Sequence, residues 1–225
     1  SRLLAEAVST LMRDNMFPVV LGGDCSNLIG CALALRRAGR YGLFFIDGHA
    51  DFYQPEEEPN GEAASMDLAI VSGRGPRLLA DIDGLGPLMR DEDIAAFAYR
   101  DAADQIKYGS QDVGATPIHT FTFEQVRKKG AVRAATLALK TIDSELVKGL
   151  WIHLDADVLD DAIMPAVDYR TPGGLGWEEL SGVLQVLIAS GLAVGMNVGI
   201  FNPRLDATGE IARRFAQCLA EGLTK

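Results

Sequence analysis

Acidic side chains and a histidine stand at alternate positions in two segments of this 225-residue chain. Asp47, His49 and Asp51 follow the apolar run "GLFFI", and Asp155 and Asp157 follow "GLWIHL". Side chains two residues apart on an extended chain point to the same side, so each set could converge. Carboxylates that converge repel one another unless cations neutralise them. The spacing therefore predicts a metal site.

The donor types also indicate which ions would bind and what they would do. Carboxylate-rich clusters with one or two nitrogen donors suit Mn²⁺ or Mg²⁺, with Zn²⁺ as an alternative. Two ions about 3.5–4 Å apart could share the carboxylates and activate a bridging water as hydroxide. Taken alone, the segment of Asp47, His49 and Asp51 could instead be a capped strand-to-helix loop. Likewise, Asp155, Asp157 and Asp160 could be acids that form a turn. Both segments together, with a strand that ends in Gly-Gly-Asp at 22–24, favour the metal site.

Short apolar strands alternate with helical segments along the chain. The expected strands are "FPVVLGG", "YGLFFID", "IAAFAYR", "GLWIHLDAD" and "LAVGMNVGIF", and Ser26 is expected to cap the helix after the first of them. This alternation indicates an α/β fold of three layers, α/β/α, with a mostly parallel sheet. We expect residues 1–225 to form one such domain. In these sheets ligands bind beyond the carboxyl ends of the strands, where all three acidic segments lie.

The composition limits the partners. A net charge of −10 argues against nucleic acids and anionic membranes. The same charge suits a cationic small-molecule substrate or metal ions, although a solvated acidic surface would explain it equally well. No apolar run reaches the length of about 18 residues that a membrane span needs. Three cysteines without paired spacing favour a reducing compartment, and we expect a cytoplasmic protein.

Three segments resemble a known family. "GGDCS", "IDGHADF" and "HLDADVLDD" are similar to the Gly-Gly-Asp-His-Ser, Asp-Ala-His-x-Asp and Ser-x-Asp-x-Asp-x-x-Asp-Pro patterns of the ureohydrolases, which include arginase, agmatinase and formimidoylglutamase. The resemblance runs in order from Leu21 to Asp206. It implies an arginase-like parallel sheet, a binuclear manganese centre and hydrolysis of guanidino or related C–N bonds. Many members of this family are oligomers, so the resemblance also implies a homo-oligomer for this chain.

The resemblance further assigns roles to individual residues. Two aspartates would bridge the ions, and two pairs of residues would each complete the shell of one ion. The bridging residues would be Asp47 and Asp155, and the pairs would be Cys25 with Asp51 and His49 with Asp157.

Cys25 departs from the family pattern, which has a metal-binding histidine there. As a thiolate, Cys25 would make the centre more negative and a weaker Lewis acid, and its soft sulfur would favour Zn²⁺ over Mn²⁺. As a buried thiol, it would leave one ion short of a ligand. The sequence leaves both alternatives open. Asp24 and Asp160 would orient ligands or loops without binding an ion.

Two more departures concern catalysis and substrate. Ala64 stands where active relatives have a histidine that transfers a proton, a step that contributes roughly 10²–10⁴-fold. His153 is a weak candidate to replace it, with a hydrogen-bonded core residue as the alternative, and Asp51 is a weak candidate to orient the attacking hydroxide. Ile200 stands where the family has a glutamate that pairs with a guanidinium, so an arginine- or agmatine-like substrate is disfavoured. Acids of the loop after Asp51 could supply charge instead, with a solvated loop as the alternative: Glu56, Glu57, Glu58 and Glu62.

Two hypotheses follow from these observations. The first is a metal-dependent hydrolase of linear amidine- or guanidino-type C–N bonds with an atypical substrate, in line with the retained ligands. The second is a catalytically degenerate homologue that binds metal or a ligand, or serves as a non-catalytic subunit. Relatives usually have a further strand and helix before the Gly-Gly-Asp segment, more than the roughly twenty residues here can form. We therefore expect an N-terminal strand and helix to be absent from this chain.

Overall fold

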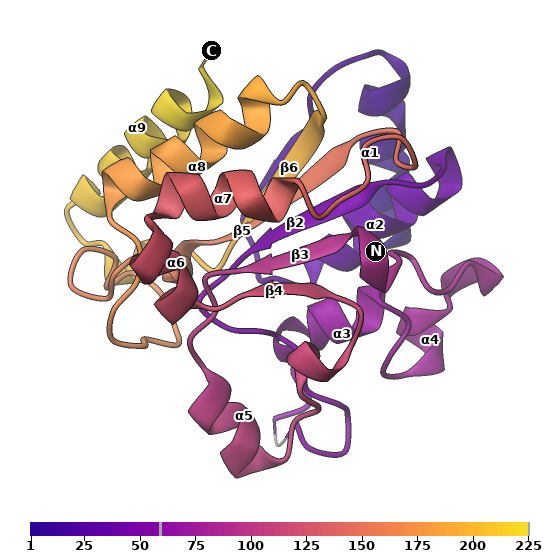
Figure 1. The fold of residues 1–225 in the computed structure, drawn as a ribbon, viewed down its shortest axis with the longest axis horizontal. Coiled ribbons are helices and arrows are strands. Elements are labelled where there is room, and N and C mark those ends of the chain that lie inside the picture. Colours follow the sequence, from indigo (N-terminus) through magenta and orange to yellow (C-terminus); the bar gives the residue numbers. More distant parts are fainter. Residues whose placement is uncertain (59, 225) are drawn as a thin grey trace.

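A parallel sheet forms the centre of the molecule (Figure 1). The computed structural model describes residues 1–58 and 60–224, and within these ranges six strands pair in the order β1-β6-β5-β2-β3-β4. Each neighbouring pair runs parallel. The strands are β1 (Val19–Leu21), β2 (Gly42–Ile46), β3 (Ile94–Phe97), β4 (His119–Phe121), β5 (Leu150–Asp155) and β6 (Ala193–Gly199).

Helices cover both faces of this sheet, as Figure 1 shows. They are α1 (Arg2–Arg13), α2 (Asn27–Ala38), α3 (Asp67–Val71), α4 (Arg77–Ala80), α5 (Ala102–Tyr108), α6 (Phe123–Lys129), α7 (Ala131–Leu139), α8 (Trp177–Ala189) and α9 (Glu210–Leu223). α7, α8 and α9 pack over one face of the sheet, and α1, α2 and α3 pack over the other. These three layers confirm the predicted α/β/α class.

Strand β2 shows why the sheet is buried on both faces. All five of its residues are buried. Phe44 and Ile46 belong to the core shared with α7 and α8, whereas Leu43 and Phe45 belong to the core shared with α1 and α2. Successive strand side chains point to opposite faces, and burial of each large apolar side chain contributes about 1.5–3 kcal/mol. A strand that is apolar at every position is therefore most stable inside the sheet.

Two local features differ from the expectations. β4 was not predicted, because its three residues are half-buried at the sheet edge and the helix signal begins directly after them. That signal is the capping box of Thr122 and Gln125 at the start of α6. Ser26 is at the N-cap position of α2, as expected, but its side chain forms no capping hydrogen bond with an N–H of the helix. Its backbone N–H and hydroxyl donate to Asp24 Oδ1 instead.

The strand order brings the three acidic segments together. β5 lies between β6 and β2, so Asp155 at the end of β5 lies next to Asp47, which follows β2. β1 pairs with the other edge of β6, and the Gly-Gly-Asp-Cys segment follows β1. Parallel strands end at the same edge of a sheet. The sheet therefore positions one shared site.

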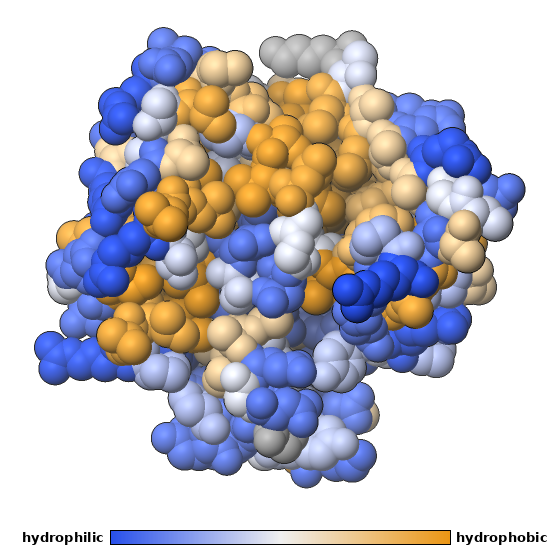
Figure 2. Space-filling model, turned by 180° about the vertical axis from the view of Figure 1, so that it is seen from behind, coloured by the Kyte–Doolittle hydropathy of each residue, from blue (hydrophilic) through white to orange (hydrophobic). Residues whose placement is uncertain are grey.

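Apolar side chains also reach the surface. Figure 2 shows a broad hydrophobic area on the face opposite to that seen in Figure 1. At the edge strand β1 and just before it, the exposed large apolar side chains are Met16, Phe17, Val19 and Leu21. Within the described ranges, no helix combines the length and the apolar character that crossing a membrane requires.

Candidate metal centre

The donors predicted from the sequence lie together at the carboxyl ends of the strands. One ligand atom from each of Cys25, Asp47 and Asp51 lies within 4.8 Å of the other two. The same holds for Asp47, His49 and Asp157, so Asp47 belongs to both groups. Two donor groups that share a carboxylate suit two neighbouring ions. Ion binding by these residues stays a prediction.

Each of three aspartates at the strand ends accepts a backbone hydrogen bond with one oxygen, from its own loop or from the neighbouring one. Asp47 Oδ1 accepts a hydrogen bond from His49 N at 2.6 Å, and Asp155 Oδ1 accepts one from Asp157 N at 2.7 Å. Asp157 Oδ1 accepts one from Gly48 N at 3.1 Å. The second oxygen of each carboxylate therefore remains for contacts within the cluster.

His49 forms the more open side of the site, with 22% of its side chain exposed. Its Nδ1 lies 2.9 Å from Asp157 Oδ2, and its Nε2 lies 3.3 Å from Thr171 Oγ1. Burial alone would lower the pKa of His49, but the charge and hydrogen bond of Asp157, together with the charges of Asp101 and Asp155, outweigh burial and raise the pKa to about 9. The ring is therefore protonated in the ion-free protein at neutral pH, and a divalent ion would have to displace that proton.

Cys25 is a buried thiol, with 1% of its surface exposed. Its Sγ donates a hydrogen bond to Asp155 Oδ2 at 2.9 Å. Burial, followed by the charge of Asp155, raises the pKa of this thiol well above its usual range. Gly199 makes room for the sulfur, since a Cβ at that position would lie 3.3 Å from Sγ. Of the two alternatives that the sequence left open, this contact favours the protonated thiol.

Asp51 adopts a left-handed backbone conformation with a φ of 44°. Such a conformation costs a non-glycine residue about 1–3 kcal/mol and is concentrated at functional sites. Two hydrogen bonds hold the turn: Ala69 N donates to Asp51 O at 3.2 Å, and Ala50 N donates to Asp101 Oδ1 at 3.2 Å. This turn places the Asp51 carboxylate, 8% exposed, against Cys25 and Asp47.

Buried carboxylates dominate the electrostatics of the site. Burial raises the pKa of Asp47, Asp51 and Asp155 well above the usual range, and the surrounding carboxylates raise it further. Burial would also raise the pKa of Asp157, but the adjacent His49 lowers it. Within residues 1–58 and 60–224, Asp47 Oδ2 has no hydrogen-bond partner. A divalent cation would satisfy that oxygen and relieve the repulsion, so these residues fit a metal centre.

His153 lies on the deep side of the cluster and is fully buried. Its ring stacks on Phe45, with 4.4 Å between ring centroids and 9° between ring planes. Burial lowers the pKa of His153 to about 3. The ring is therefore neutral at pH 7 and can offer a hydrogen bond there, but it holds no extra proton for a leaving group.

Three residues of this region were not predicted from the sequence: Asp67, Arg100 and Asp101. Asp67, the first residue of α3, is fully buried beside Cys25. Arg100 Nη2 donates to the backbone oxygens of Asp157 at 2.8 Å and of Thr171 at 2.9 Å. An acid within the apolar run "SMDLAIV" is the signal that could have revealed Asp67. Arg100 and its neighbour Asp101 follow the end of β3. The predicted donors follow the ends of other strands in the same way, so this position is the signal for both residues.

Asp24 and Asp160 lie outside both donor groups and hold turns. Asp24 Oδ1 accepts from Ser26 N, and Asp160 Oδ1 accepts from Ala162 N, each at 2.9 Å. Ile200 packs against the apolar core in a left-handed conformation with a φ of 67°. Neither acid belongs to a donor group, and Ile200 offers no charge for a guanidinium.

The acidic loop after Asp51 forms contacts of its own. Glu58 Oε2 accepts a hydrogen bond from Glu62 N at 2.8 Å, and Glu62 Oε2 accepts one from the Tyr169 hydroxyl at 3.0 Å. Pro59 of this loop lies outside the described residues. These contacts favour a structural use of Glu58 and Glu62 over a role in binding a cationic substrate.

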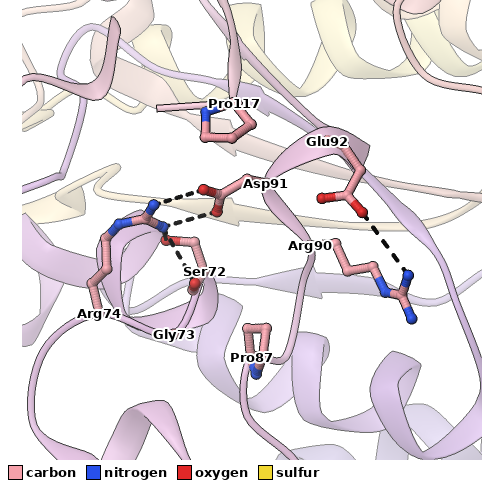
Figure 3. A pocket seen from close by; sticks show the side chains of 8 residues that line it. All are labelled: Ser72, Gly73, Arg74, Pro87, Arg90, Asp91, Glu92 and Pro117. Carbon is pink, nitrogen blue, oxygen red and sulfur yellow. Dashed lines mark hydrogen bonds and ion pairs between the residues drawn. The ribbon is translucent and has the colours of Figure 1, made fainter. Parts of the chain in front are cut away.

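A surface pocket of about 440 Å³ lies away from the donors (Figure 3). Arg74 pairs with Asp91 in this pocket, with Nη2 and Oδ2 2.6 Å apart. Asp91 precedes β3, so the pocket lies at the amino end of that strand, whereas the donors lie at the carboxyl ends. Its lining residues are Ser72, Gly73, Arg74, Pro87, Arg90, Asp91, Glu92 and Pro117.

Comparison with known proteins assigns the chain to one family. The family described as "Arginase family" matches residues 1–224. Arginase from Staphylococcus aureus (strain COL) is 31% identical over 212 residues, which cover 94% of this chain and 68% of that protein. Arginase from Bacillus caldovelox is 28% identical over 210 residues, which cover 93% of this chain and 69% of that protein. The chain belongs to the arginase family, and the resemblance seen in the sequence is confirmed.

Solved structures with the same fold agree with this assignment. Arginase from Bacillus cereus matches with a TM-score of 0.86 at 23% identity, over 100% of this chain and 76% of that one. Formimidoylglutamase from Bacillus subtilis matches with a TM-score of 0.80 at 20% identity, over 98% of this chain and 64% of that one. At these identities the similarity shows the fold alone. The predicted arginase-like sheet is therefore confirmed.

Proposed function

We propose that this chain is a metal-dependent hydrolase of linear amidine- or guanidino-type C–N bonds that acts on an atypical small-molecule substrate. The observation that carries the proposal is the pair of buried donor groups that share Asp47. Membership of the arginase family supports the same class of reaction. Relatives named arginase, formimidoylglutamase and agmatinase indicate the range of compounds to test.

The centre would hold two divalent ions, with Mn²⁺ as the first expectation and Zn²⁺ as the second. Such ions, when bound, lower the pKa of the water that they bind and polarise the carbon atom of the C–N bond to be hydrolysed. Asp51, held in its strained turn, would orient the nucleophile, and Arg100 holds the loop of Asp157 in place. The expected ligands are Cys25, Asp47, His49, Asp51, Asp155 and Asp157.

The substrate is expected to differ from an unmodified guanidinium compound. Ile200 packs against the apolar core and cannot pair with a cation. Ala64 cannot transfer a proton, and the neutral, buried His153 is a poor substitute. A substrate whose leaving group needs no proton from an acidic side chain would suit this site.

A catalytically degenerate homologue is the second candidate. The thiol of Cys25, which donates to Asp155, favours it because a protonated thiol is a weak metal ligand. Under this alternative the chain would bind metal or a small ligand, or serve as a non-catalytic subunit. We expect a cytoplasmic protein under both alternatives, and a homo-oligomer if the chain is the hydrolase. The buried free cysteines at 25, 31 and 218 agree with a reducing compartment.

Metal content and turnover separate these candidates. Protein dialysed against Mn²⁺ or Zn²⁺ would be analysed for bound metal and then assayed against guanidino, formimino and amide compounds. We expect two ions per chain and product release from at least one compound. Asp47→Asn should lose both ions, because this residue belongs to both groups. Less than one retained ion would contradict the metal centre, whereas two ions without turnover would favour the degenerate homologue.

A further inference from the structure

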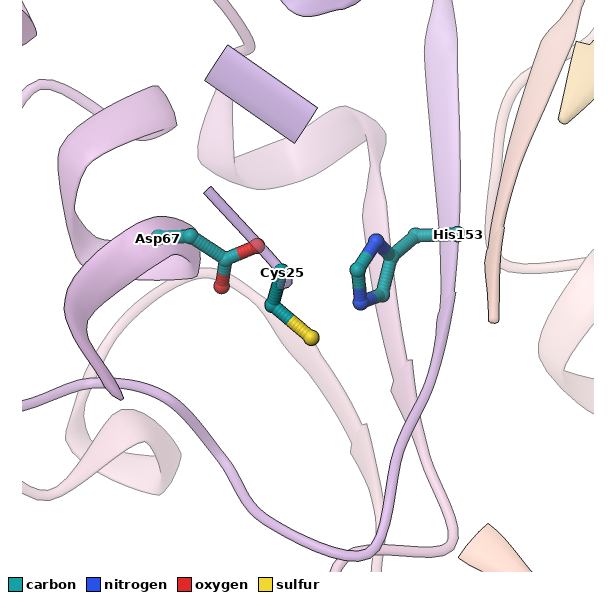
Figure 4. Close-up of side chains that lie close together, drawn as sticks. All are labelled: Cys25, Asp67 and His153. Atoms are coloured by element: carbon teal, nitrogen blue, oxygen red, sulfur yellow. The ribbon is translucent and has the colours of Figure 1, made fainter. Parts of the chain in front are cut away.

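Asp67 is a buried acid that the metal ligands named above do not include. It is fully buried, and within the described residues neither of its carboxylate oxygens has a hydrogen-bond donor. One Asp67 oxygen, Cys25 Sγ and a ring nitrogen of His153 all lie within 4.8 Å of one another (Figure 4). The carboxyl of Asp51 also lies close to Asp67 and adds to the negative charge there. A buried carboxylate in this state calls for a cation.

A chain of hydrogen bonds fixes the proton of His153. Trp151 Nε1–H, which can only donate, donates to Asn197 Oδ1 at 2.8 Å. Asn197 Nδ2 must therefore face His153, whose Nδ1 accepts from it at 2.8 Å. With Nδ1 as an acceptor, the neutral ring carries its hydrogen on Nε2. That nitrogen faces the cluster, 3.7 Å from Asp47 Oδ2, so His153 presents a donor there and no lone pair for a metal ion.

Cys25 does not supply the missing lone pair either. Its thiol hydrogen is directed at Asp155 Oδ2, and a thiol that keeps its hydrogen binds metal weakly. Within the described residues, the atoms of these three side chains without a hydrogen-bond partner are both oxygens of Asp67 and Nε2 of His153, and of these only the Asp67 oxygens offer lone pairs to a metal ion. Asp67 lies on the same side of the site as Asp51, whose electrostatic environment it affects.

We propose that Asp67 is a metal ligand that replaces the family's missing histidine: one of its oxygens completes the shell of the ion bound by Asp47 and Asp51. The inference rests on the proposed metal centre and names a donor that the family pattern does not contain. His153 Nε2–H would hydrogen-bond to the carboxylates of this shell and offset part of the added negative charge. An oxygen-rich shell favours a hard ion such as Mn²⁺ over Zn²⁺.

Mn²⁺ titration of Asp67→Asn tests the proposal. The amide keeps the size of the side chain and removes a buried charge. Calorimetric titration of chelator-treated protein should give two tight ions for the wild type. For Asp67→Asn, one ion should bind at least roughly 10–100-fold more weakly. This is the loss typical for residues that hydrogen-bond to metal ligands, and a direct ligand should contribute no less. Asp67→Ser serves as a second variant, and circular dichroism checks that both variants fold.

Asp24→Asn is the control variant and should keep both ions at unchanged affinity, because it removes an exposed acid that belongs to no donor group. Cys25→Ser tests the ligand that the family pattern places at position 25. If Asp67 has replaced that ligand, Cys25→Ser should also bind two ions, since serine retains a hydrogen-bond donor to Asp155. Wild-type affinity for both ions in folded Asp67→Asn would overturn the proposal. Loss of an ion in Cys25→Ser would also overturn it, because the thiolate would then be the replacement ligand. Co²⁺-loaded wild type would in that case show thiolate-to-metal charge-transfer absorption that Cys25→Ser lacks.

Failure of the proposed function gives a different result. If the wild-type chain binds no Mn²⁺ in the same titration, the metal centre itself is refuted and Asp67 with it. If the wild type binds two ions and Asp67→Asn does as well, the centre stands and only the role of Asp67 is refuted.

Discussion

Gly48 stands where the family pattern has alanine, and its surroundings explain the exchange. A Cβ at this position would lie 2.5 Å from Arg100 Nη1 and 2.7 Å from Asp157 Oδ1. Arg100 fills this space while Nη2 holds the backbone oxygens of Asp157 and Thr171. The position of the Arg100 guanidinium therefore requires a residue without a Cβ at position 48.

Gly48→Ala is expected to destabilise the fold by about 1–3 kcal/mol, because overpacking a buried loop forces its neighbours to move. Thermal unfolding measures the loss. Gly176→Ala is the matched control, since its Cβ would meet Glu179 Oε2 at an ordinary 3.6 Å. Arg100→Ala should reduce the penalty of Gly48→Ala in the double variant. Equal losses at Gly48 and Gly176 would contradict this explanation.

At the scale of elements, strands β5 and β6 together determine which ring nitrogen of His153 carries the hydrogen and faces the carboxylates. Asn197 of β6 links Trp151 and His153 of β5 through two hydrogen bonds of 2.8 Å. Gly195 lets the strands meet in this way, because a Cβ there would lie 2.3 Å from the Trp151 ring. The neighbouring strand therefore fixes which ring nitrogen of His153 carries hydrogen.

Asn197→Asp is expected to move hydrogen to Nδ1 of His153. A carboxylate can accept from both Trp151 and His153 Nδ1–H, whereas the amide donates to Nδ1. The ¹⁵N chemical shift of Nδ1 should change from that of an acceptor to that of an N–H nitrogen. Asn197→Leu is the companion variant and should cost about 1–3 kcal/mol for each polar partner left buried without a hydrogen bond. An unchanged Nδ1 shift in Asn197→Asp would refute the assignment.

The sequence predicts the elements better than it predicts the residues between them. Fully apolar strands such as β2 and acids directly after strand ends predict the parallel sheet and most of the cluster. Asp67 is different, because it reaches Cys25 only through the packing of α3 against α2, which no local pattern encodes. Which ring nitrogen of His153 carries hydrogen likewise depends on Asn197, from a strand 44 residues away in the sequence. Departures at Ala64 and Ile200 are visible in the sequence through the family pattern alone.

For the whole molecule, the concentration of buried acids links stability to pH and to metal. A buried aspartate with a raised pKa binds its proton more tightly in the folded state than in the unfolded state. This applies to Asp47, Asp51, Asp67 and Asp155, whereas the lowered pKa of Asp157 acts in the opposite direction. The ion-free fold therefore gains stability as the pH falls below neutrality, until these groups are protonated in both states.

Ion-free protein is expected to have a lower free energy of unfolding at about pH 8.5 than at about pH 6. His49 acts in the same direction, because its stabilising contribution is lost as the pH rises through its pKa of about 9. Urea unfolding in the presence of a chelator measures the difference. Mn²⁺ at about 100 times its dissociation constant should add roughly 2.7 kcal/mol for each ion bound at the higher pH. A stability that rises with pH in the chelated protein would contradict these assignments.

Trp151 gives the buried end of the site an optical signal. Its indole is fully buried and only two hydrogen bonds away from the face of His153 that meets the cluster. The other tryptophan, Trp177 on α8, lies beneath the guanidinium of Arg214 and packs against the core on the opposite face of the sheet from Trp151. A Trp177→Phe chain would therefore fluoresce from the one indole that is coupled to the centre. The emission of that indole would report changes at the carboxylates without any added dye.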